Sequence, residues 1–296
     1  MPSAHLFIHN VRLKAPKKGK VPDFIIAGIE KSGTTSLFVH LSKHPAIEMV
    51  PHAVEYMKAG KLDNMKEPHF FNKRWTKGLD WYRGLFNDND KLQGEAASNY
   101  LFKEEYIKRM SSVAPHAKII VALRDPVARA YSQYVYSKEL YRKLLPGTLS
   151  RLRADKDRII KIVKLRDISF DEAIKIEIKK GISAGTGNIG KGLYIDLLGN
   201  LLKYYPRRQI LFIISERMKA DMSGTYNNIF DFLGLEATKI DFEMDVLAGK
   251  YEKPMSSWAR ETLSEIYGPY NERLSFLLGH KIDEWGVKDE CASVYS

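Results

Sequence analysis

Apolar runs and amphipathic stretches alternate along the chain. Three short apolar runs, at 23–28, 118–123 and 209–214, are typical of strands buried on both faces of a parallel sheet. A helical pattern over 34–41 follows the first run directly, and leucines recur at helical spacing over 193–205, just before the third. This alternation predicts an α/β fold, in which helices flank a central parallel sheet.

Three further helices are expected from their end signals. Asp125 and Pro126 open one of them directly after the second strand, because Asp caps a helix and Pro favours its first position. A short helix is predicted over 227–233. A long helical stretch over 256–278 is expected to break near 268–269, because the proline there removes a helical hydrogen bond.

The chain of 296 residues is expected to form one domain. No linker rich in proline, glycine or serine divides it. We place the domain at 22–290, after an N-terminal extension over 1–21 and before a tail over 291–296. The charged segment 138–182 has helical propensity and lies between two core elements, so we expect a helical insertion or lid.

The composition is that of a folded globular protein, with 44% hydrophobic and 28% charged residues. A formal net charge of +11 predicts an anionic partner, such as a nucleotide, a sulfated or phosphorylated substrate, nucleic acid or a membrane surface. The segment 138–180 holds 13 Lys and Arg against 7 Asp and Glu. It could be a solvated helical face, guide an anionic acceptor or form a subunit contact, so the oligomeric state stays open.

The cysteine count and the hydropathy pattern bear on the cellular compartment of the protein. The single cysteine, Cys291, excludes an intrachain disulfide framework and a cysteine-cluster metal site. No run of about 18 apolar residues predicts a membrane-spanning helix, and residues 1–20 lack the apolar core of a secretory signal. These features favour a cytoplasmic protein with no membrane partner.

The segment 28–36, GIEKSGTTS, follows the first predicted strand and opens a helix. Backbone N–H groups at such a helix start bind anions, and the helix dipole favours negative charge there. Gly28 and Gly33 allow a tight turn, Lys31 adds positive charge and the hydroxyls add donors. Lys31 precedes the second glycine, whereas the lysine of a Walker A motif follows it, and this difference disfavours an enzyme that uses ATP-Mg. The segment also lacks the G-x-G-x-x-G fingerprint of dinucleotide-binding folds.

Two segments carry a resemblance to a known family. The sequence KSGTTS at 31–36 resembles the 5′-phosphosulfate loop of sulfotransferases that use 3′-phosphoadenosine 5′-phosphosulfate (PAPS). The sequence ALRDPVARAYS at 122–132 is similar to the family's 3′-phosphate loop. In that loop an Arg ends a strand and a Ser lies on the following helix. The resemblance covers about 22–285, apart from 138–182, and softer matches such as KEPHFF at 66–71 point to the branch of heparan-sulfate and bacterial nodulation-type sulfotransferases.

The resemblance implies a P-loop-like sheet, PAPS as the donor and PAP as the product. Lys31 would contact the bridging oxygen and assist the departure of PAP. The remaining residues implied in donor binding are Ser32, Gly33, Thr34, Thr35 and Ser36 at the 5′-phosphate, Arg124 and Ser132 at the 3′-phosphate, and Lys250, Tyr251 and Lys253 in a late loop over the cofactor. No metal is implied, and the sequence offers no compact cluster of metal ligands.

The acceptor needs a proton acceptor. The family's catalytic carboxylate matches Glu67, and His69 is the competitor because other branches use a His base. On an extended segment residues two apart share a face, so both could line the cleft. A departure from the family lies at 95–100, EAASNY, where Ala96 stands in place of an active-site Lys. This difference weakens any transfer of substrate identity.

The sequence therefore predicts a PAPS-dependent sulfotransferase (EC 2.8.2 type). Its acceptor would be a hydroxyl or amine of a small secondary metabolite, a carrier-bound intermediate or an oligosaccharide. Two alternatives stay open: a P-loop phosphotransferase, and a non-catalytic protein that binds polyanions. Nucleic acid is disfavoured as a partner, because no nucleic-acid motif accompanies the basic excess.

Overall fold

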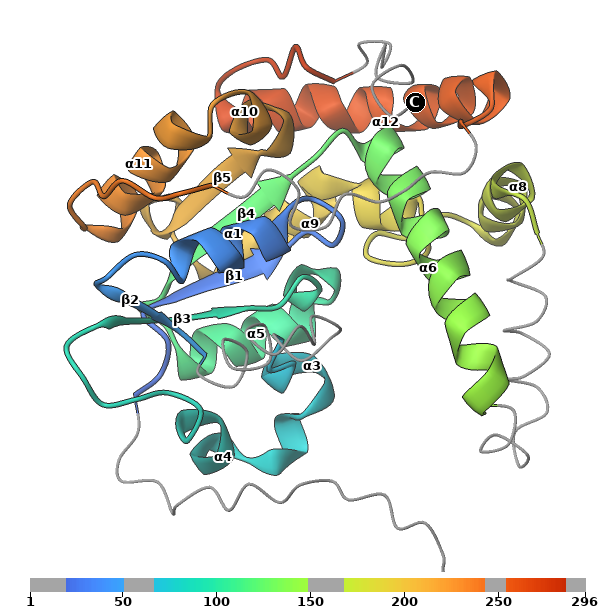
Figure 1. Cartoon of the computed structure of the whole chain (residues 1–296). Coiled ribbons are helices and arrows are strands. Elements are labelled where there is room, and N and C mark those ends of the chain that lie inside the picture. Colours follow the sequence, from blue (N-terminus) through green and yellow to red (C-terminus); the bar gives the residue numbers. More distant parts are fainter. Residues whose placement is uncertain (1–19, 51–66, 149–167, 243–253, 286–296) are drawn as a thin grey trace, which may run out of the picture.

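A central sheet of five parallel strands confirms the predicted fold class. The computed structural model describes residues 20–50, 67–148, 168–242 and 254–285 (Figure 1). Every neighbouring pair of strands is parallel, and their order across the sheet is β2-β3-β1-β4-β5. The strands are β1 (Phe24–Gly28), β2 (Ile47–Met49), β3 (Leu92–Ala96), β4 (Lys118–Leu123) and β5 (Ile210–Ile214).

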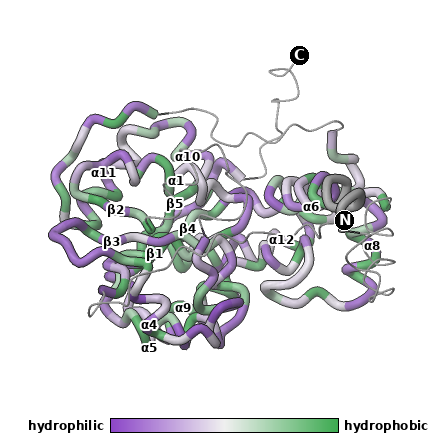
Figure 2. The backbone as a smooth tube through the Cα atoms, turned by 60° about the horizontal axis from the view of Figure 1, so that its bottom comes forward, coloured by the Kyte–Doolittle hydropathy of each residue, from purple (hydrophilic) through white to green (hydrophobic). Residues whose placement is uncertain are grey.

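Helices cover both faces of this sheet. Figure 2 shows α1, α10 and α11 on one side of the strands and α5 and α9 on the other. The helices are α1 (Thr34–Leu41), α3 (Phe70–Lys73), α4 (Leu79–Arg83), α5 (Glu104–Val113), α6 (Pro126–Thr148), α8 (Phe170–Lys180), α9 (Tyr194–Tyr204), α10 (Ser215–Ala220), α11 (Met222–Leu233) and α12 (Ser257–Leu278). Short 3-10 turns lie between them, namely η1 (Trp75–Lys77), η2 (Tyr100–Phe102), η3 (Gly190–Gly192) and η4 (Arg207–Gln209).

The main core lies along β1 and β4. All residues of β1 are buried, as are residues 119–123 of β4. The predicted helix over 193–205 is α9, and its Leu197, Leu198 and Leu201 are buried against this core. The apolar runs of β1 and β4 therefore form central strands, because helices shield them on both faces.

Two helix predictions needed correction. The predicted break in α12 is wrong: the helix continues through Pro269. Residues on both sides of the proline are buried, Leu263 and Tyr267 before it and Leu274 after it, so packing holds the helix where one backbone hydrogen bond is missing. The short helix over 227–233 begins earlier, at Met222, because the Asp221 carboxylate accepts a hydrogen bond from the Gly224 N–H (2.8 Å) and caps it.

A second, smaller core joins α6, α8 and α12. It includes Val127 and Ala130 of α6, Ile174 of α8 and Leu263 of α12. The predicted insertion over 138–182 thus begins inside α6 and ends after α8, while residues 149–167 lie outside the described ranges. Whether the segment acts as a lid stays a prediction.

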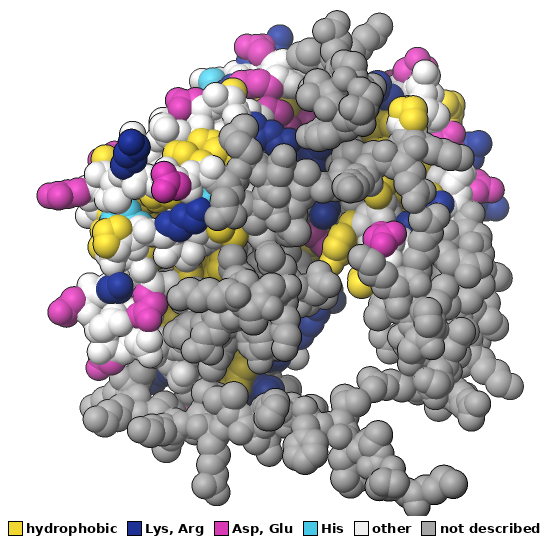
Figure 3. Space-filling model, in the orientation of Figure 1, with side chains coloured by type: hydrophobic (Ala, Val, Ile, Leu, Met, Phe, Trp, Pro, Cys, Tyr) yellow, Lys and Arg dark blue, Asp and Glu magenta, His cyan; other side chains and the backbone are white. Residues whose placement is uncertain are grey.

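Side chains of both charge signs are scattered over the described part of the face in Figure 3. Among the helices that the structure describes, none is long and apolar enough to cross a bilayer. Within the same ranges, His, Cys, Asp and Glu side chains form no group of three or more that could hold a metal ion.

Candidate active site

The loop after β1, which the sequence predicts to bind an anion, forms a cradle at the start of α1. Gly33 adopts a left-handed conformation (φ 92°) at the helix N-cap, and a Cβ there would lie 2.9 Å from the Met218 Cε. Lys31 is also left-handed (φ 70°). The first N–H groups of a helix have no carbonyl partner within it, so those of α1 face the loop. The left-handed backbone favours glycine here, and any side chain would also have to displace the end of Met218.

Side chains from distant segments surround the cradle. The Lys31 Nζ lies 4.3 Å from the centroid of the Tyr136 ring, which α6 supplies. The Glu30 carboxylate pairs with the Lys191 Nζ at 2.8 Å. Burial alone would raise the pKa of Glu30, but the Lys191 ammonium, and then the Arg129 guanidinium, hold it below its usual value. The sequence patterns did not identify Tyr136, Glu30, Lys191 or Arg129, because these pairings join residues far apart in the chain.

The second anion loop follows β4, the strand adjacent to β1. The Arg124 Nη1 donates a hydrogen bond to the Lys31 carbonyl (3.4 Å), so the structure brings the two predicted loops together. The Ser215 hydroxyl lies 2.6 Å from the Ser32 carbonyl oxygen and 2.9 Å from that of Leu123, which ties the loop after β1 and the end of β4 to α10. Lys31 and Arg124 thus lie at the carboxyl edge of the sheet, where α/β folds bind ligands.

The helix that follows this loop begins as predicted. The Asp125 Oδ1 accepts a hydrogen bond from the Val127 N–H (3.0 Å) and caps α6. Ser132 is buried two turns along this helix. Tyr194 is buried, and its hydroxyl donates to the Arg124 carbonyl (2.8 Å). That contact fixes the backbone from which the Arg124 side chain extends.

Glu67 and His69 lie together just before α3. Both side chains are buried, and the His69 Nε2 lies 3.5 Å from the Glu67 Oε2. The other carboxylate oxygen, Oε1, accepts a hydrogen bond from the Ser98 hydroxyl (2.9 Å). Burial, helped by the charges of Lys73 and Arg74, lowers the pKa of His69 to about 4. The imidazole is therefore neutral near pH 7, beside a carboxylate that can accept a proton.

A second carboxyl group, that of Glu95, is buried beneath this pair. The Tyr82 hydroxyl donates to its Oε1 (2.6 Å), and the Tyr100 hydroxyl lies 3.4 Å from its Oε2. Burial raises the pKa of Glu95 to about 8, although both tyrosines act in the opposite direction. Glu95 is fully buried and hydrogen-bonded, so it supports the site from the protein interior.

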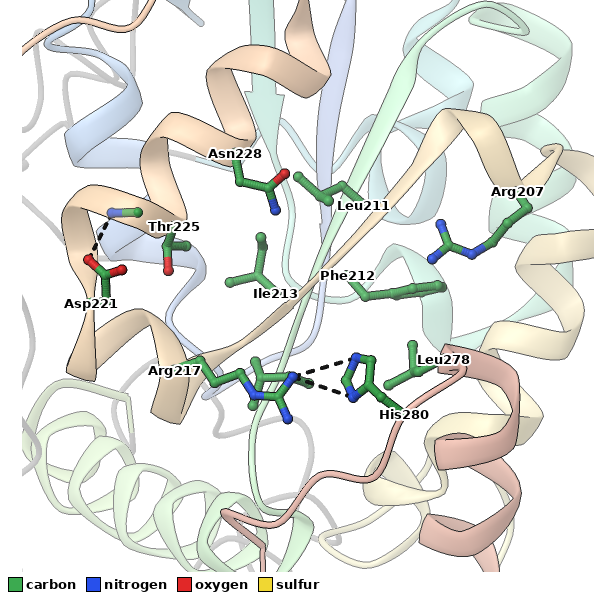
Figure 4. A pocket seen from close by; sticks show the side chains of 12 residues that line it. Arg207, Leu211, Phe212, Ile213, Arg217, Asp221, Thr225, Asn228, Leu278 and His280 are labelled. Atoms are coloured by element: carbon green, nitrogen blue, oxygen red, sulfur yellow. Dashed lines mark hydrogen bonds between the residues drawn. The ribbon is translucent and has the colours of Figure 1, made fainter.

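A separate pocket, of about 370 Å³, lies along the edge strand β5 (Figure 4). Arg207, Arg217 and His280 contribute to its lining. The Arg217 Nε already donates to the Glu284 carboxylate (2.6 Å), so its charge is compensated. None of the predicted site residues that the structure describes lines this pocket. The predicted late-loop residues Lys250, Tyr251 and Lys253 lie outside the described residues.

Comparison with known proteins identifies the family. The family model for the sulfotransferase domain matches residues 21–265. The chain therefore belongs to the sulfotransferase domain family. The crystal structure of a sulfotransferase from Alicyclobacillus acidocaldarius is similar, with a TM-score of 0.65 and 25% identity over 90% of this chain and 99% of that one.

Curated relatives extend the comparison. Heparan sulfate glucosamine 3-O-sulfotransferase 3B1 of Homo sapiens is 32% identical over 219 residues, which are 73% of this chain and 47% of that protein. Heparan sulfate glucosamine 3-O-sulfotransferase 6 of Mus musculus is 28% identical over 228 residues, 76% of this chain and 56% of that protein. The human bifunctional heparan sulfate N-deacetylase/N-sulfotransferase 3 is 27% identical over 303 residues, 90% of this chain and 30% of that protein. The chain thus spans about half or less of the length of these relatives.

Proposed function

We propose that the protein transfers a sulfuryl group from PAPS to a hydroxyl or amine of a glycan acceptor and releases PAP. One observation carries the proposal. The two anion loops lie at the ends of the adjacent strands β1 and β4, and the Arg124 side chain bonds to the Lys31 carbonyl between them. A donor with two separate phosphate positions fits such a pair of loops better than a single anion does.

The residues present fit this donor. The left-handed turn at Gly33 and the first N–H groups of α1 suit the 5′-phosphosulfate, together with the hydroxyls of 32–36. Arg124 and Ser132, at the start of α6, suit the 3′-phosphate, because a guanidinium binds phosphate with two parallel hydrogen bonds. When bound, PAPS supplies an activated sulfuryl group on a good leaving group.

Two side chains then perform the chemistry. The Lys31 ammonium neutralises the charge that develops on the departing oxygen. Glu67 accepts the proton that the attacking hydroxyl or amine loses. His69 is the weaker candidate, because its pKa of about 4 makes it a poor base and it lies at 3.5 Å from the carboxylate itself. A neutral imidazole there can orient either the carboxylate or the acceptor.

The glycan acceptor rests on the curated relatives, whose names refer to heparan sulfate and glucosamine. Ala96 replaces the Lys that the family resemblance implies, so the sugar and the position that is sulfated are expected to differ from those of the relatives. A small-molecule or carrier-bound acceptor is the alternative outcome of the acceptor test.

The donor is tested first, by calorimetric titration of the full chain with PAP at moderate salt, with ATP-Mg as the matched control. Stoichiometric, micromolar or tighter binding of PAP without binding of ATP-Mg is expected. Binding of ATP-Mg alone would favour a phosphotransferase. Binding of neither nucleotide, together with salt-sensitive binding of heparin, would favour a non-catalytic polyanion binder.

The acceptor is tested next, with radiolabelled PAPS and a panel of sugars. De-O-sulfated heparan sulfate, unsulfated heparosan and chitin oligosaccharides offer free hydroxyls in different settings. De-N-sulfated heparan sulfate offers a free amine. Transfer to at least one glycan is expected. Binding of PAP with no transfer to any member would keep the donor assignment and overturn the glycan acceptor.

A further inference from the structure

The segment after β3 supports the segment that carries Glu67. Besides the Ser98 hydrogen bond to Glu67, the Asn99 Oδ1 accepts a hydrogen bond from the Asn72 Nδ2 (2.7 Å). The Tyr100 hydroxyl accepts one from the Phe70 N–H (3.0 Å). Three consecutive side chains, 98–100, therefore contact residues 67–72, and Ser98 is the one that donates a hydrogen bond to the Glu67 carboxylate.

The backbone around Ser98 is firmly held. The Ala97 N–H donates to the Ile26 carbonyl of β1 (2.9 Å), and Asn99 forms an antiparallel bridge with Gly28. The Ser98 hydroxyl thus extends from a backbone that is joined to the central strand on both sides. A donor on such a backbone can hold a carboxylate in one orientation without much loss of side-chain freedom.

The environment makes this hydrogen bond significant. Ser98 is 9% exposed and Glu67 is 8% exposed, so water competes weakly for either group. With Oε1 held by Ser98, the other oxygen, Oε2, is the one that lies toward His69. We therefore expect Oε2 of Glu67, rather than Oε1, to take the proton that the acceptor loses.

Several titratable or charged groups surround Glu67. His69 approaches its Oε2, and the Arg74 Nη1 donates to the main-chain oxygen of Pro68 (2.6 Å) and lies 3.5 Å from that of Glu67. From β3, Glu95 interacts electrostatically with Glu67. Among these described neighbours, Ser98 is an uncharged donor whose hydroxyl can be removed without changing the charge of the site.

We infer that Ser98 is a positioning residue for the proposed base: its hydroxyl orients the Glu67 carboxylate and favours the ionised form. A hydrogen bond to a carboxylate stabilises that form over the protonated one. The catalytic meaning of this inference rests on the proposed function, whereas the effect on the titration of Glu67 does not.

The first test compares Ser98→Ala with Ser98→Thr, which restores a hydroxyl. Transfer from PAPS to de-O-sulfated heparan sulfate is measured across pH. In Ser98→Ala, kcat is expected to fall about tenfold, and the acid limb of the kcat/KM profile to move up by about one pH unit. The Kd for PAP should not change, and Ser98→Thr should recover most of both losses.

Two further variants control this comparison. Ser112→Ala removes an exposed hydroxyl that bonds to the Arg109 carbonyl within α5 (2.8 Å), and it should leave all readouts unchanged. Ser98→Cys keeps nearly the same volume with a weak donor. It should shift the profile in the same direction as Ser98→Ala, even if the alanine variant folds poorly.

A second measurement needs neither PAPS nor an acceptor. Carbon-13 NMR of side-chain carboxyls in the full chain gives the titration midpoint of Glu67, identified by the signal that Glu67→Gln removes. The midpoint is expected to rise by about one pH unit in Ser98→Ala and to return in Ser98→Thr. An unchanged midpoint in a folded Ser98→Ala protein would overturn the inference. Absence of transfer by the unmodified chain would instead count against the proposed function and leave this measurement intact.

Discussion

The two sides of the site are built in different ways. The proposed donor side, after β1 and β4, would use backbone N–H groups at the start of α1 together with Lys31 and Arg124, which lie in the loops after these strands. The base side, between β3 and α3, uses buried side chains that bond to one another across more than 30 residues of sequence, as Ser98 does with Glu67. The first side depends on local chain geometry, and the second depends on tertiary packing.

This difference has consequences for substitution. A loop that binds through backbone groups loses little when one hydroxyl is removed, but it loses function when its turn or its cations change. A buried network of side chains responds to each deletion, because a partner is left without its hydrogen bond in a low dielectric. Changes on the donor side should therefore alter affinity for PAP, and those on the base side should alter turnover and pH dependence.

Glu67→Gln is expected to give the largest effect. The amide cannot accept the proton, so kcat should fall by about 10²–10⁴-fold while the Kd for PAP stays the same. Turnover and calorimetric titration with PAP measure the two quantities. His69→Ala is the matched comparison and should reduce turnover less. Full turnover in Glu67→Gln together with loss in His69→Ala would assign the base to His69.

Arg124→Ala should give the opposite pattern. Loss of a charge-assisted contact to the 3′-phosphate costs about 1.5–3 kcal/mol, so the Kd for PAP should rise by about 10- to 100-fold. Arg208→Ala is the control. Arg208 is exposed in η4, just before β5 begins, whereas Arg124 follows the end of β4. Equal PAP affinity in the two variants would remove Arg124 from the donor site.

The donor side could be predicted because its determinants are contiguous in sequence. The expected strand 118–123 and helix 34–41 coincide with β4 and α1, and the loop between β1 and α1 has its Lys31 and Gly33 within a few residues. An apolar run predicts a buried strand from its own sequence, and the residues beside it mark where that strand ends. The family resemblance added the pairing of this loop with Arg124.

The base side was harder to predict because β3 does not resemble a strand. Its sequence, LQGEA, is polar, yet Gln93 and Glu95 are completely buried. The Gln93 Nε2 donates to Glu48 (3.0 Å), and the Tyr82 hydroxyl donates to Glu95. At Gly94 a Cβ would meet the Phe24 ring at 2.3 Å. The partners that make these residues suitable for a central strand lie in other segments, and no local pattern reveals them.

Glu95 gives a pH test of the base-side network. Its folded-state pKa of about 8 lies above the ordinary 4.5, so the folded protein holds a proton that the unfolded chain loses. This contribution is fully present below about pH 4.5 and is lost as the pH rises to about 8. The contribution of His69 lies mainly between its folded-state pKa of about 4 and the ordinary value of 6.5, so Glu95 contributes more than His69 does in the interval from 6.5 to 8.

In Glu95→Gln, the amide replaces the protonated carboxyl with nearly the same shape. The unmodified protein should lose about 1–2 kcal/mol of stability between pH 6.5 and 8, and the variant should lose less. Urea unfolding at the two pH values measures the difference. An identical slope in both proteins would show that Glu95 does not hold this proton.

Tyr136 tests whether the donor side also depends on a distant side chain. Its ring lies 4.3 Å from the Lys31 Nζ, a distance at which a cation and an aromatic face attract by about 0.5–1 kcal/mol. Tyr136→Leu should therefore lower kcat by about two- to fivefold, because the ammonium is held less firmly where the leaving oxygen develops charge. Tyr136→Phe keeps the ring and should retain most of the activity. If Leu and Phe behave alike, the ring does not position Lys31, and the loop that the sequence predicted is sufficient by itself. If Tyr136→Phe keeps the activity that Tyr136→Leu loses, α6 supports the donor side in the way that the segment after β3 supports the base. The contrast between the two sides is then one of degree.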